Sequence, residues 1–413
     1  MKELEKAIKS FSNHKMTGDD GMVTETLKYA ESESAKSKLL NLFAIAWNTG
    51  QLPTLMCRIT LLPIFKKGDP LECSNYRGIA NLSQWLKILS KIIYFRIDSY
   101  CEQIGVFQET QNGFRTARGR RDLILIVRYV QSLFVEKNLN LYMAFIDIAK
   151  TYNSIQRELI WKVLKKIGLP PLLIRMLKMI YESIECRVRV EGIDSDPFTI
   201  LVGLLQGDSN STLIFNVIFS MIIEITHQRL DSAGIKLRVR LDKNFLKVMK
   251  SRSKGETLTI LELVFADDTF LCTDNEDDLQ KAVIIFSEVC MWFGLQVSVE
   301  KTEVMIQKAK TSTIHTNPVV LIRENQLKNC QHYRYLGSII AHDSRISKEI
   351  NARVQKSNAA FSKLYQRVWS RSTLSLKTKA SVYRTMILPI LTQDCETWHL
   401  KHKHYMKLEG CQY

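Results

Sequence analysis

Residues 257–273 read TLTILELVFADDTFLCT, two apolar runs that meet at Asp267 and Asp268. Short apolar runs on either side of a polar turn are typical of a β-hairpin. Adjacent carboxylates repel each other, and hydrophobic strands beside them add a desolvation cost unless a cation is present. Aspartate is also a common turn residue, and an isolated Asp-Asp pair is usually no more than that.

A third carboxylate, Asp147, ends another apolar stretch, LNLYMAFID at 139–147. This stretch is too short for a typical helix and rich in aromatic and aliphatic residues, so it predicts a strand. Two metal ions about 4 Å apart need carboxylates from separate strand ends. Magnesium prefers oxygen ligands. Together with the basic charge of the chain and the motifs described below, the three aspartates favour a two-metal site for phosphoryl transfer over a purely structural role.

The rest of the chain alternates helical and strand patterns. Apolar residues spaced 3.6 apart predict surface-packed helices, and Leu213–Ile225 predicts a buried one. The expected helices cover 2–12, 34–48, 86–103 and 276–293, and further strands are expected at 295–299 and 333–340. Strands interleaved with packing helices predict an α+β core around one antiparallel sheet.

Composition and net charge indicate a folded protein with a preference for anionic partners. The 413 residues are 46% hydrophobic and 24% charged, which is typical of a folded chain of two or three domains. The net charge of +16 favours a polyphosphate partner, although chromatin, ribosomal and membrane-surface proteins share such an excess. Residues 345–413 hold 13 Lys or Arg against 4 Asp or Glu.

A helix over 348–369 is expected to have one apolar face and one cationic face. The apolar face holds Ile350, Val354, Phe361, Leu364 and Val368, and the cationic face holds Lys348, Arg353, Lys356, Lys363 and Arg367.

No run reaches the roughly 18 apolar residues of a membrane span, so an intracellular protein without a membrane partner is expected. The nine cysteines, without a C-x-x-C pair, predict reduced thiols.

Seven motifs in order resemble the reverse transcriptase domain of non-LTR retrotransposons, the long-interspersed-element type, over nearly the whole chain. They are LPIFKKGDPLECSNYRGIANLS (62–83), QETQNGFRTARGRRD (108–122), FIDIAKTYNSI (145–155), GLLQGDSNSTLIFN (203–216), FADD (265–268), GLQVSVEKTEVM (294–305) and YRYLGSII (333–340). The resemblance implies a right-hand polymerase with fingers, an antiparallel-sheet palm and a helical thumb. We expect an N-terminal extension at 1–50, fingers and palm at 51–340 and a basic thumb at 341–413.

The resemblance also implies roles for single residues. Asp147, Asp267 and Asp268 would be the palm carboxylates, holding two Mg²⁺ ions or, alternatively, Mn²⁺. Lys301 would be a general acid for the departing pyrophosphate. The incoming nucleotide would be bound by Lys66, Lys67, Arg77, Tyr152, Gln206 and Gly207. Of these, Tyr152 would exclude a 2′-hydroxyl. Tyr335, Leu336 and Gly337 would form the primer grip.

The implied function is RNA-directed DNA polymerisation, with an RNA template, a DNA primer or target DNA and dNTPs as partners. An endonuclease domain is expected upstream in the full element protein, and the family implies action in the nucleus and cytoplasm. The alternative is a catalytically silent, RNA-binding relative from a decayed or co-opted element. A basic chromatin or ribosomal protein and an RNA-dependent RNA polymerase are further rivals.

Several motifs depart from the family pattern. Thr151, Tyr152 and Asn153 stand where Ala-Phe-Asp is usual, and Ser209 and Thr212 replace prolines. The segments ARGRR (117–121) and LTQDCETW (391–398) also differ from the family. These changes favour the silent alternative, whereas the three retained aspartates favour catalysis. The cluster of Cys395, His399, His402, His404 and Cys411 lacks a common zinc spacing, so a basic, nucleic-acid-facing tail is the preferred interpretation.

Overall fold

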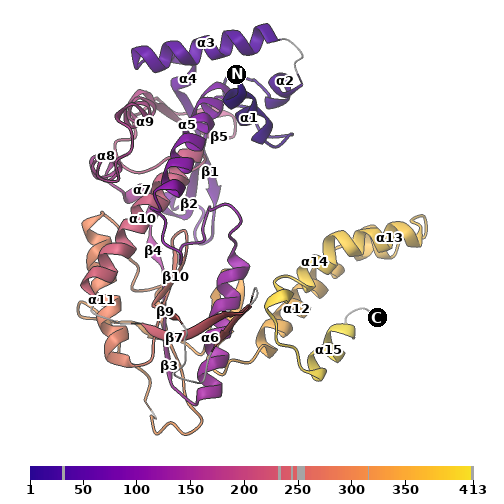
Figure 1. Cartoon of the computed structure of the whole chain (residues 1–413). Coiled ribbons are helices and arrows are strands. Elements are labelled where there is room, and N and C mark those ends of the chain that lie inside the picture. Colours follow the sequence, from indigo (N-terminus) through magenta and orange to yellow (C-terminus); the bar gives the residue numbers. More distant parts are fainter. Residues whose placement is uncertain (30–32, 231–233, 243–244, 249–255, 315, 411–413) are drawn as a thin grey trace. The chain divides into compact units, whose positions relative to one another are not determined.

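The computed structural model describes residues 1–29, 33–230, 234–242, 245–248, 256–314 and 316–410 (Figure 1). The chain forms two compact units, each assembled from three separate stretches. The first unit comprises 1–114, 149–228 and 288–296, and the second comprises 115–148, 229–287 and 297–413. Both contain helices and sheets, which confirms the α+β class. The three consecutive segments expected from the sequence stay a prediction.

The first unit is mostly helical and contains one four-stranded sheet. Its helices are α1 (Lys2–Ser10), α2 (Thr24–Lys28), α3 (Glu33–Thr49), α4 (Thr54–Cys57), α5 (Gln84–Gln103), α7 (Thr151–Ser154), α8 (Arg157–Lys166), α9 (Pro171–Ser183) and, almost entirely, α10 (Ser209–Arg229). Its sheet has the order β2-β1-β5-β6, from β1 (Arg58–Phe65), β2 (Tyr76–Asn81), β5 (Glu185–Val190) and β6 (Ile193–Asp194). Strand β1 pairs antiparallel with β2 and parallel with β5.

Helix α5 confirms the predicted helix at 86–103. Its first turn is capped by Ser83, whose side chain accepts a hydrogen bond of 3.2 Å from the Leu86 N–H. The apolar positions of the predicted stripe are all buried. These are Leu86, Leu89, Ile92, Ile93 and Ile97.

Helix α10 confirms the buried helix expected over Leu213–Ile225. Among the described residues it is the one helix long and apolar enough to cross a membrane by length and composition. Its most apolar stretch is 72% buried within the protein, as in the core helix of a globular domain. Ser209 and Thr212, which replace two family prolines, lie in its first turn.

The second unit is built on a five-stranded sheet of order β10-β11-β3-β13-β16. The strands are β3 (Leu141–Ile146), β10 (Glu262–Phe265), β11 (Asp268–Thr273), β13 (Glu303–Gln307) and β16 (Lys328–Asn329). Strand β3 lies at the centre and pairs antiparallel with both β11 and β13. All six of its residues are buried, which explains why the sequence there is a nearly unbroken apolar run.

Helix α6 (Arg120–Lys137) contributes the apolar side chains Leu123, Val127 and Phe134 to the core of this unit. They cluster with Met143 and Phe145 of β3. Helix α11 (Glu276–Trp292) confirms the predicted apolar stripe, since Leu279, Ala282, Val283, Phe286 and Val289 are buried.

The predicted hairpin over 257–273 is present, but it covers only 262–273. Strand β9 (Glu256–Ile260) pairs with β7 (Ile235–Asp242) in a separate three-stranded sheet that also contains β8 (Phe245–Val248). Leu261 separates the two pairings, and its carbonyl accepts a hydrogen bond of 2.8 Å from the Cys272 N–H. The sequence does not show that β9 and β10 pair with different strands, because both segments have the apolar composition of a strand.

The remaining described strands form separate two-stranded sheets. They are β4 (Ile148–Ala149), β12 (Gln296–Val297), β14 (Leu321–Ile322), β15 (Asn325–Gln326), β17 (His332–Tyr335) and β18 (Ser338–Ala341). The strand expected at 295–299 is reduced to β12, and the stretch expected at 333–340 is the antiparallel hairpin β17–β18. The eight cysteines among the described residues are free thiols, as predicted; Cys411 lies outside the described residues.

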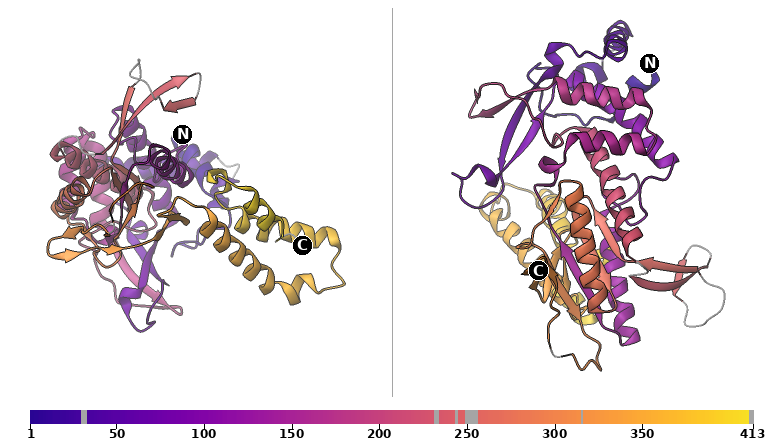
Figure 2. Two further views of the ribbon diagram at one scale, coloured as in Figure 1. Left: turned by 90° about the horizontal axis from the view of Figure 1, so that it is seen from below. Right: turned by 90° about the vertical axis from the view of Figure 1, so that its left-hand side faces the viewer.

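The C-terminal helices are α12 (Ser347–Lys363), α13 (Leu376–Val382), α14 (Leu388–Leu391) and α15 (His402–Glu409). Helix α12 runs beside α14 (Figure 2) and is followed by a π-helical turn at Tyr365–Trp369. The sequence placed Arg353 on the cationic face of this helix, and that is wrong. Arg353 is buried together with Glu349, Ile350 and Ser357, because an acidic partner one turn away neutralises it.

Candidate active site

Asp147 and Asp268 lie at neighbouring strand ends in the second unit. Strand β3 ends at Ile146, and the register of the antiparallel ladder pairs Ile146 with Thr269 of β11. Asp147 directly follows Ile146 and Asp268 directly precedes Thr269, so extending the register by one residue sets Asp147 opposite Asp268. Residues directly opposite in an antiparallel pair have Cβ atoms about 4.5–5.5 Å apart. The sheet thus brings together two carboxylates that are 121 positions apart in the chain.

The electrostatics agree with this placement. Burial and, after it, the negative charges of Asp267 and Asp147 together raise the pKa of the Asp268 carboxyl to about 6. The Asp268 side chain still contacts solvent, so the carboxylate lies at an open end of the sheet. Mutual repulsion of three carboxylates is the condition that a bound cation relieves.

Asp267 lies in the turn of the hairpin β10–β11. Phe265 pairs with Asp268, which leaves Ala266 and Asp267 as the two turn residues. Ala266 has φ +58°, a left-handed backbone that residues with a Cβ rarely adopt. Such strained positions concentrate at functional sites.

A loop preceding β13 holds Asp147 in place. The Ser298 N–H donates to the Asp147 carbonyl (2.8 Å), and the Asp147 N–H donates to Thr302 Oγ1 (3.3 Å). Lys301 Nζ lies 3.5 Å from Asp147 Oδ1, so the predicted general acid is adjacent to a predicted metal ligand. Thr302 is fully buried and was not singled out from the sequence, although its position next to Lys301 within a motif was a usable signal.

The hairpin β17–β18, predicted as the primer grip, packs against the strand that carries Asp147. The Tyr333 ring stacks on Phe145 with centroids 4.3 Å apart and planes 15° apart. The Tyr335 hydroxyl donates to the Leu263 carbonyl (3.3 Å). Burial, then Asp268 and Asp147, raise the pKa of Tyr333 to about 12. Tyr333 lay within the quoted motif, but its stacking role was missed.

Three predicted nucleotide-binding cations gather on the β1–β2 hairpin of the first unit. Arg77 pairs with Ile64 across the ladder, and the Lys66 N–H donates to the Asn75 carbonyl (2.9 Å). Lys66, Lys67 and Arg77 are exposed. The hairpin therefore presents three cations to solvent, as a phosphate-binding surface requires.

Gln206 and Gly207 form a turn against β2 in the same unit. The Ala80 N–H donates to the Gln206 carbonyl (2.6 Å). Gly207 has φ +123°, and a Cβ there would lie 2.5 Å from the Ala80 carbonyl oxygen. The close backbone approach expected at this glycine is thus made to the protein's own strand.

Tyr152 lies on the short helix α7 of the first unit. Its ring stacks on Phe215 of α10, with centroids 5.2 Å apart and planes 21° apart. The ring is half-buried, so one part packs on the core and another part remains accessible. This geometry suits both a core aromatic and a platform beneath a bound sugar.

The described carboxylates do not form a closed metal cage. Across the stretches of chain that the structure describes, no three His, Cys, Asp or Glu side chains lie close enough together to hold a metal ion. Magnesium does not require such a cage, since it keeps several waters and is usually bound by one or two carboxylates plus substrate phosphates. Asp147 together with one carboxylate of the neighbouring pair Asp267 and Asp268 fits that mode. The roles of all predicted site residues stay predictions.

Comparison with known proteins identifies the class. A family model described as reverse transcriptase (RNA-dependent DNA polymerase) matches residues 64–340. The chain belongs to this reverse transcriptase family, which confirms the predicted family and polymerase fold. Reverse transcriptases are generally metal-dependent.

Its relatives are reverse transcriptases of non-LTR retrotransposons. The RNA-directed DNA polymerase from mobile element jockey of Drosophila funebris is 21% identical over 94% of this chain and 40% of its own length. The probable RNA-directed DNA polymerase from transposon X-element of Drosophila melanogaster is 22% identical over 99% and 42%. The Pol polyprotein from the type-1 retrotransposable element R2 of Nasonia vitripennis is 23% identical over 81% and 30%. The chain spans less than half the length of these relatives.

Among solved structures, an apo telomerase from Candida tropicalis, truncated from its C-terminal domain, aligns with a TM-score of 0.46 at 14% identity. The alignment covers 78% of this chain and 64% of the telomerase.

Proposed function

We propose that this chain is an RNA-directed DNA polymerase of a non-LTR retrotransposon, which adds dNTPs to a primer 3′-hydroxyl on an RNA template. The observation that carries the proposal is the position of Asp147 opposite Asp268 at the end of the central strands, in a chain of the reverse transcriptase family. In the reaction, the 3′-oxygen forms a bond to the α-phosphorus, and the bond to pyrophosphate breaks.

Asp147 and Asp267, with Asp268 beside them, would hold two Mg²⁺ ions or Mn²⁺, which polarise the 3′-hydroxyl and neutralise phosphate charge. Lys66, Lys67 and Arg77 bind the triphosphate, and Arg77 is suited to grip phosphate bidentately. Gln206 and Gly207 shape the nucleotide pocket. Tyr152 excludes the 2′-hydroxyl. The hairpin of Tyr333 and Tyr335 orients the primer end.

Lys301 gives a proton to the departing pyrophosphate. Its ammonium already lies at the edge of the carboxylate group, 3.5 Å from Asp147, where a cation offsets local negative charge. The chain acts on target DNA within a longer element protein that also holds an endonuclease domain. We further propose that the protein acts in the nucleus and cytoplasm.

Primer extension on an RNA template with Mg²⁺ tests the proposal. Asp147→Asn and Asp267→Asn should each lower the rate by roughly 100-fold or more, because metal binding supplies several kcal/mol of transition-state stabilisation. Asp277→Asn, an exposed aspartate on α11, is the matched control and should extend normally.

A silent, RNA-binding relative is the second candidate, favoured by Asn153 where the family usually has aspartate. It predicts RNA binding by the unaltered chain without any extension at saturating template and dNTP. Extension that is equally fast in the Asp147→Asn and Asp277→Asn variants would reject the two-carboxylate mechanism.

A further inference from the structure

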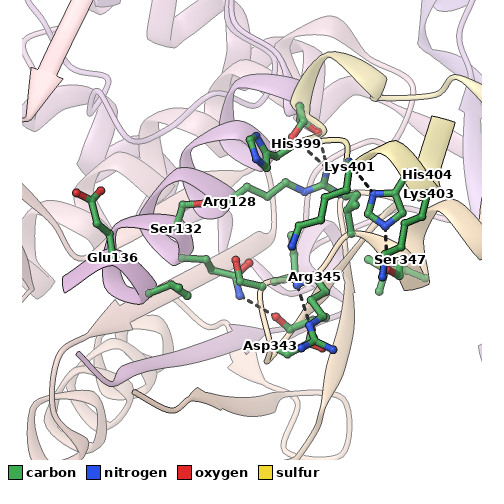
Figure 3. Close-up of a pocket in the computed structure, with 18 of the residues that line it drawn as sticks. Arg128, Ser132, Glu136, Asp343, Arg345, Ser347, His399, Lys401, Lys403 and His404 are labelled. Atoms are coloured by element: carbon green, nitrogen blue, oxygen red, sulfur yellow. Dashed lines mark hydrogen bonds and ion pairs between the residues drawn. The ribbon is translucent and has the colours of Figure 1, made fainter. Parts of the chain in front are cut away.

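A cavity of about 760 Å³ opens in the second unit, away from the aspartates. Its walls come from α6, from the loop after β18 and from the segment that leads into α15 (Figure 3). At the α6 wall, the Gln131 carbonyl accepts a hydrogen bond of 2.8 Å from Gln307 Nε2. Gln307 pairs with Leu141, the first residue of β3. Six residues of strand, roughly 20 Å, separate this end from Asp147.

The cavity is strongly basic. Five cationic side chains line it against two carboxylates, and Figure 3 labels Arg128, Arg345, Lys401 and Lys403 among the lining residues. The cations are Arg128, Lys310, Arg345, Lys401 and Lys403, and the carboxylates are Glu136 and Asp343. Asp343 is already engaged, because its carboxylate accepts the Arg345 N–H (3.0 Å) and lies 3.7 Å from Arg345 Nε. The remaining charge is predominantly positive.

Arg128 makes the cavity more than a patch of surface lysines. Its guanidinium is half-buried and is fixed by hydrogen bonds from Nη1 to the Thr397 carbonyl (3.2 Å) and Oγ1 (2.9 Å). Burial lowers the pKa of Arg128 to about 10, which leaves it charged at neutral pH. Nη2 also donates to Ser338 Oγ (3.4 Å), and the negative charges of Glu349 and Asp394 partly offset the effect of burial. A half-buried cation held in a fixed position is a strong hydrogen-bond donor to a phosphate.

Helix α15 carries lysines at its N-terminus, where positive charge is unfavourable. Lys401 occupies the N-cap position without a side-chain cap, Lys403 follows in the first turn, and that turn contains no acidic residue. The N-terminus of a helix bears partial positive charge, so cations there cost free energy unless an anion lies nearby. A helix N-terminus with lysines beside it favours a bound phosphate.

Ser347 supplies a neutral donor at the same place. The Lys401 N–H donates to His404 Nδ1 (3.1 Å), so the neutral imidazole carries its proton on Nε2. That nitrogen lies 3.0 Å from Ser347 Oγ and donates to it. The hydroxyl hydrogen of Ser347 is then available to an acceptor in the cavity. Because both ring nitrogens are used, His404 is poorly placed as a zinc ligand.

We propose that this cavity binds phosphate groups, carried either by a nucleic-acid strand or by a free polyphosphate. Lys401, Lys403 and Arg345 provide charge, and Arg128 and Ser347 provide fixed donors. The site does not depend on the polymerase reaction, since it lies at the other end of the central strand.

The test uses the full chain carrying Asp147→Asn, in EDTA, so that divalent metals play no part. Binding of inorganic tripolyphosphate and of a 20-nucleotide single-stranded RNA is measured for three proteins. They are the parent, the pocket variant Lys401→Gln/Lys403→Gln and the control variant Lys38→Gln/Lys162→Gln, which removes two exposed lysines of the first unit. A second pocket variant, Lys310→Gln/Arg345→Gln, covers the case in which the first does not fold.

The pocket variant should lose about tenfold in affinity for at least one probe, and the control less than twofold. A loss for RNA alone, with a salt slope smaller by about 1.4, identifies a strand as the phosphate source. A loss for tripolyphosphate alone identifies a free polyphosphate. If folded pocket variants and the control bind both probes equally well, the site does not exist.

Discussion

Arg353 Nε lies 2.5 Å from Glu349 Oε1, one helical turn away on α12, and both side chains are almost completely buried. The same guanidinium donates to the Gly337 carbonyl (2.8 Å) and lies 3.6 Å from Asp394. Glu349 Oε2 accepts the Ile339 N–H (2.6 Å). The ion pair therefore ties the first C-terminal helix to the turn of the hairpin β17–β18, which packs beside the strand of Asp147.

Replacing Arg353 by Met should destabilise the chain by about 3–5 kcal/mol, because Glu349 is then buried without its cationic partner. Lys356→Met, at an exposed position on the same helix, should change the free energy of unfolding by less than about 0.5 kcal/mol. Urea denaturation followed by circular dichroism measures both. Equal stability of the two variants would show that the network contributes little.

Replacing Gly207 by Ala should destabilise the first unit by roughly 1–3 kcal/mol or more, because φ +123° disfavours a side chain and the Cβ would meet the Ala80 carbonyl. Gly78→Ala is the matched control on the neighbouring strand, since a Cβ there meets nothing within 4 Å. Thermal unfolding compares the two. A Gly207→Ala chain as stable as the Gly78→Ala chain would contradict the close approach.

Asp208, fully buried before α10, should make stability depend on pH. Burial raises its pKa from 3.8 to about 6, against hydrogen bonds that lower it. Because the folded-state pKa is the higher one, the contribution is fully present below pH 3.8 and is lost as pH rises through 6. Asp208→Asn should therefore match the parent at pH 4 and exceed its stability by up to about 3 kcal/mol at pH 8. Urea denaturation at both pH values checks this, and a pH-independent difference would argue against a buried charge.

The sequence predicted those parts of the fold in which one local pattern decides the outcome. The apolar stripes of α5 and α11 and the strand that ends at Asp147 follow directly from residue spacing and burial. The register that sets Asp147 opposite Asp268 was only implied by the family, because no local pattern specifies which strands pair.

What the sequence did not predict depends on contacts between distant segments. The burial of Arg353 requires Gly337 and Asp394, and the stacking of Tyr333 requires Phe145. The two segments that depart from the family pattern also meet, since Arg121 Nη1 lies 2.7 Å from Glu396 Oε1. Such pairings are set by tertiary structure and leave no periodic signal in the chain.

Tyr152→Val should raise incorporation of ribonucleotides relative to deoxynucleotides by roughly tenfold, if the ring excludes a 2′-hydroxyl. Tyr152→Phe keeps the ring and its stacking on Phe215, so it should retain discrimination. Single-nucleotide extension with matched dNTP and rNTP measures the ratio of kcat/KM values. If Tyr152→Val is merely less stable and discriminates as before, the tyrosine is a core aromatic.

Lys301→Leu should slow the chemical step by roughly 100-fold with little effect on dNTP affinity, as expected for loss of a general acid. Lys328→Leu, an exposed lysine on β16 of the same sheet, removes an equal charge and is the control. Pre-steady-state extension separates dNTP binding from chemistry for both variants.

Because Lys301 Nζ also lies 3.5 Å from Asp147 Oδ1, its loss can act through charge alone. In that case Lys301→Arg, which preserves the charge but cannot give up a proton, would restore the rate. A Lys301→Arg chain as slow as Lys301→Leu supports proton transfer, whereas full rescue reduces the role of Lys301 to neutralising the carboxylates.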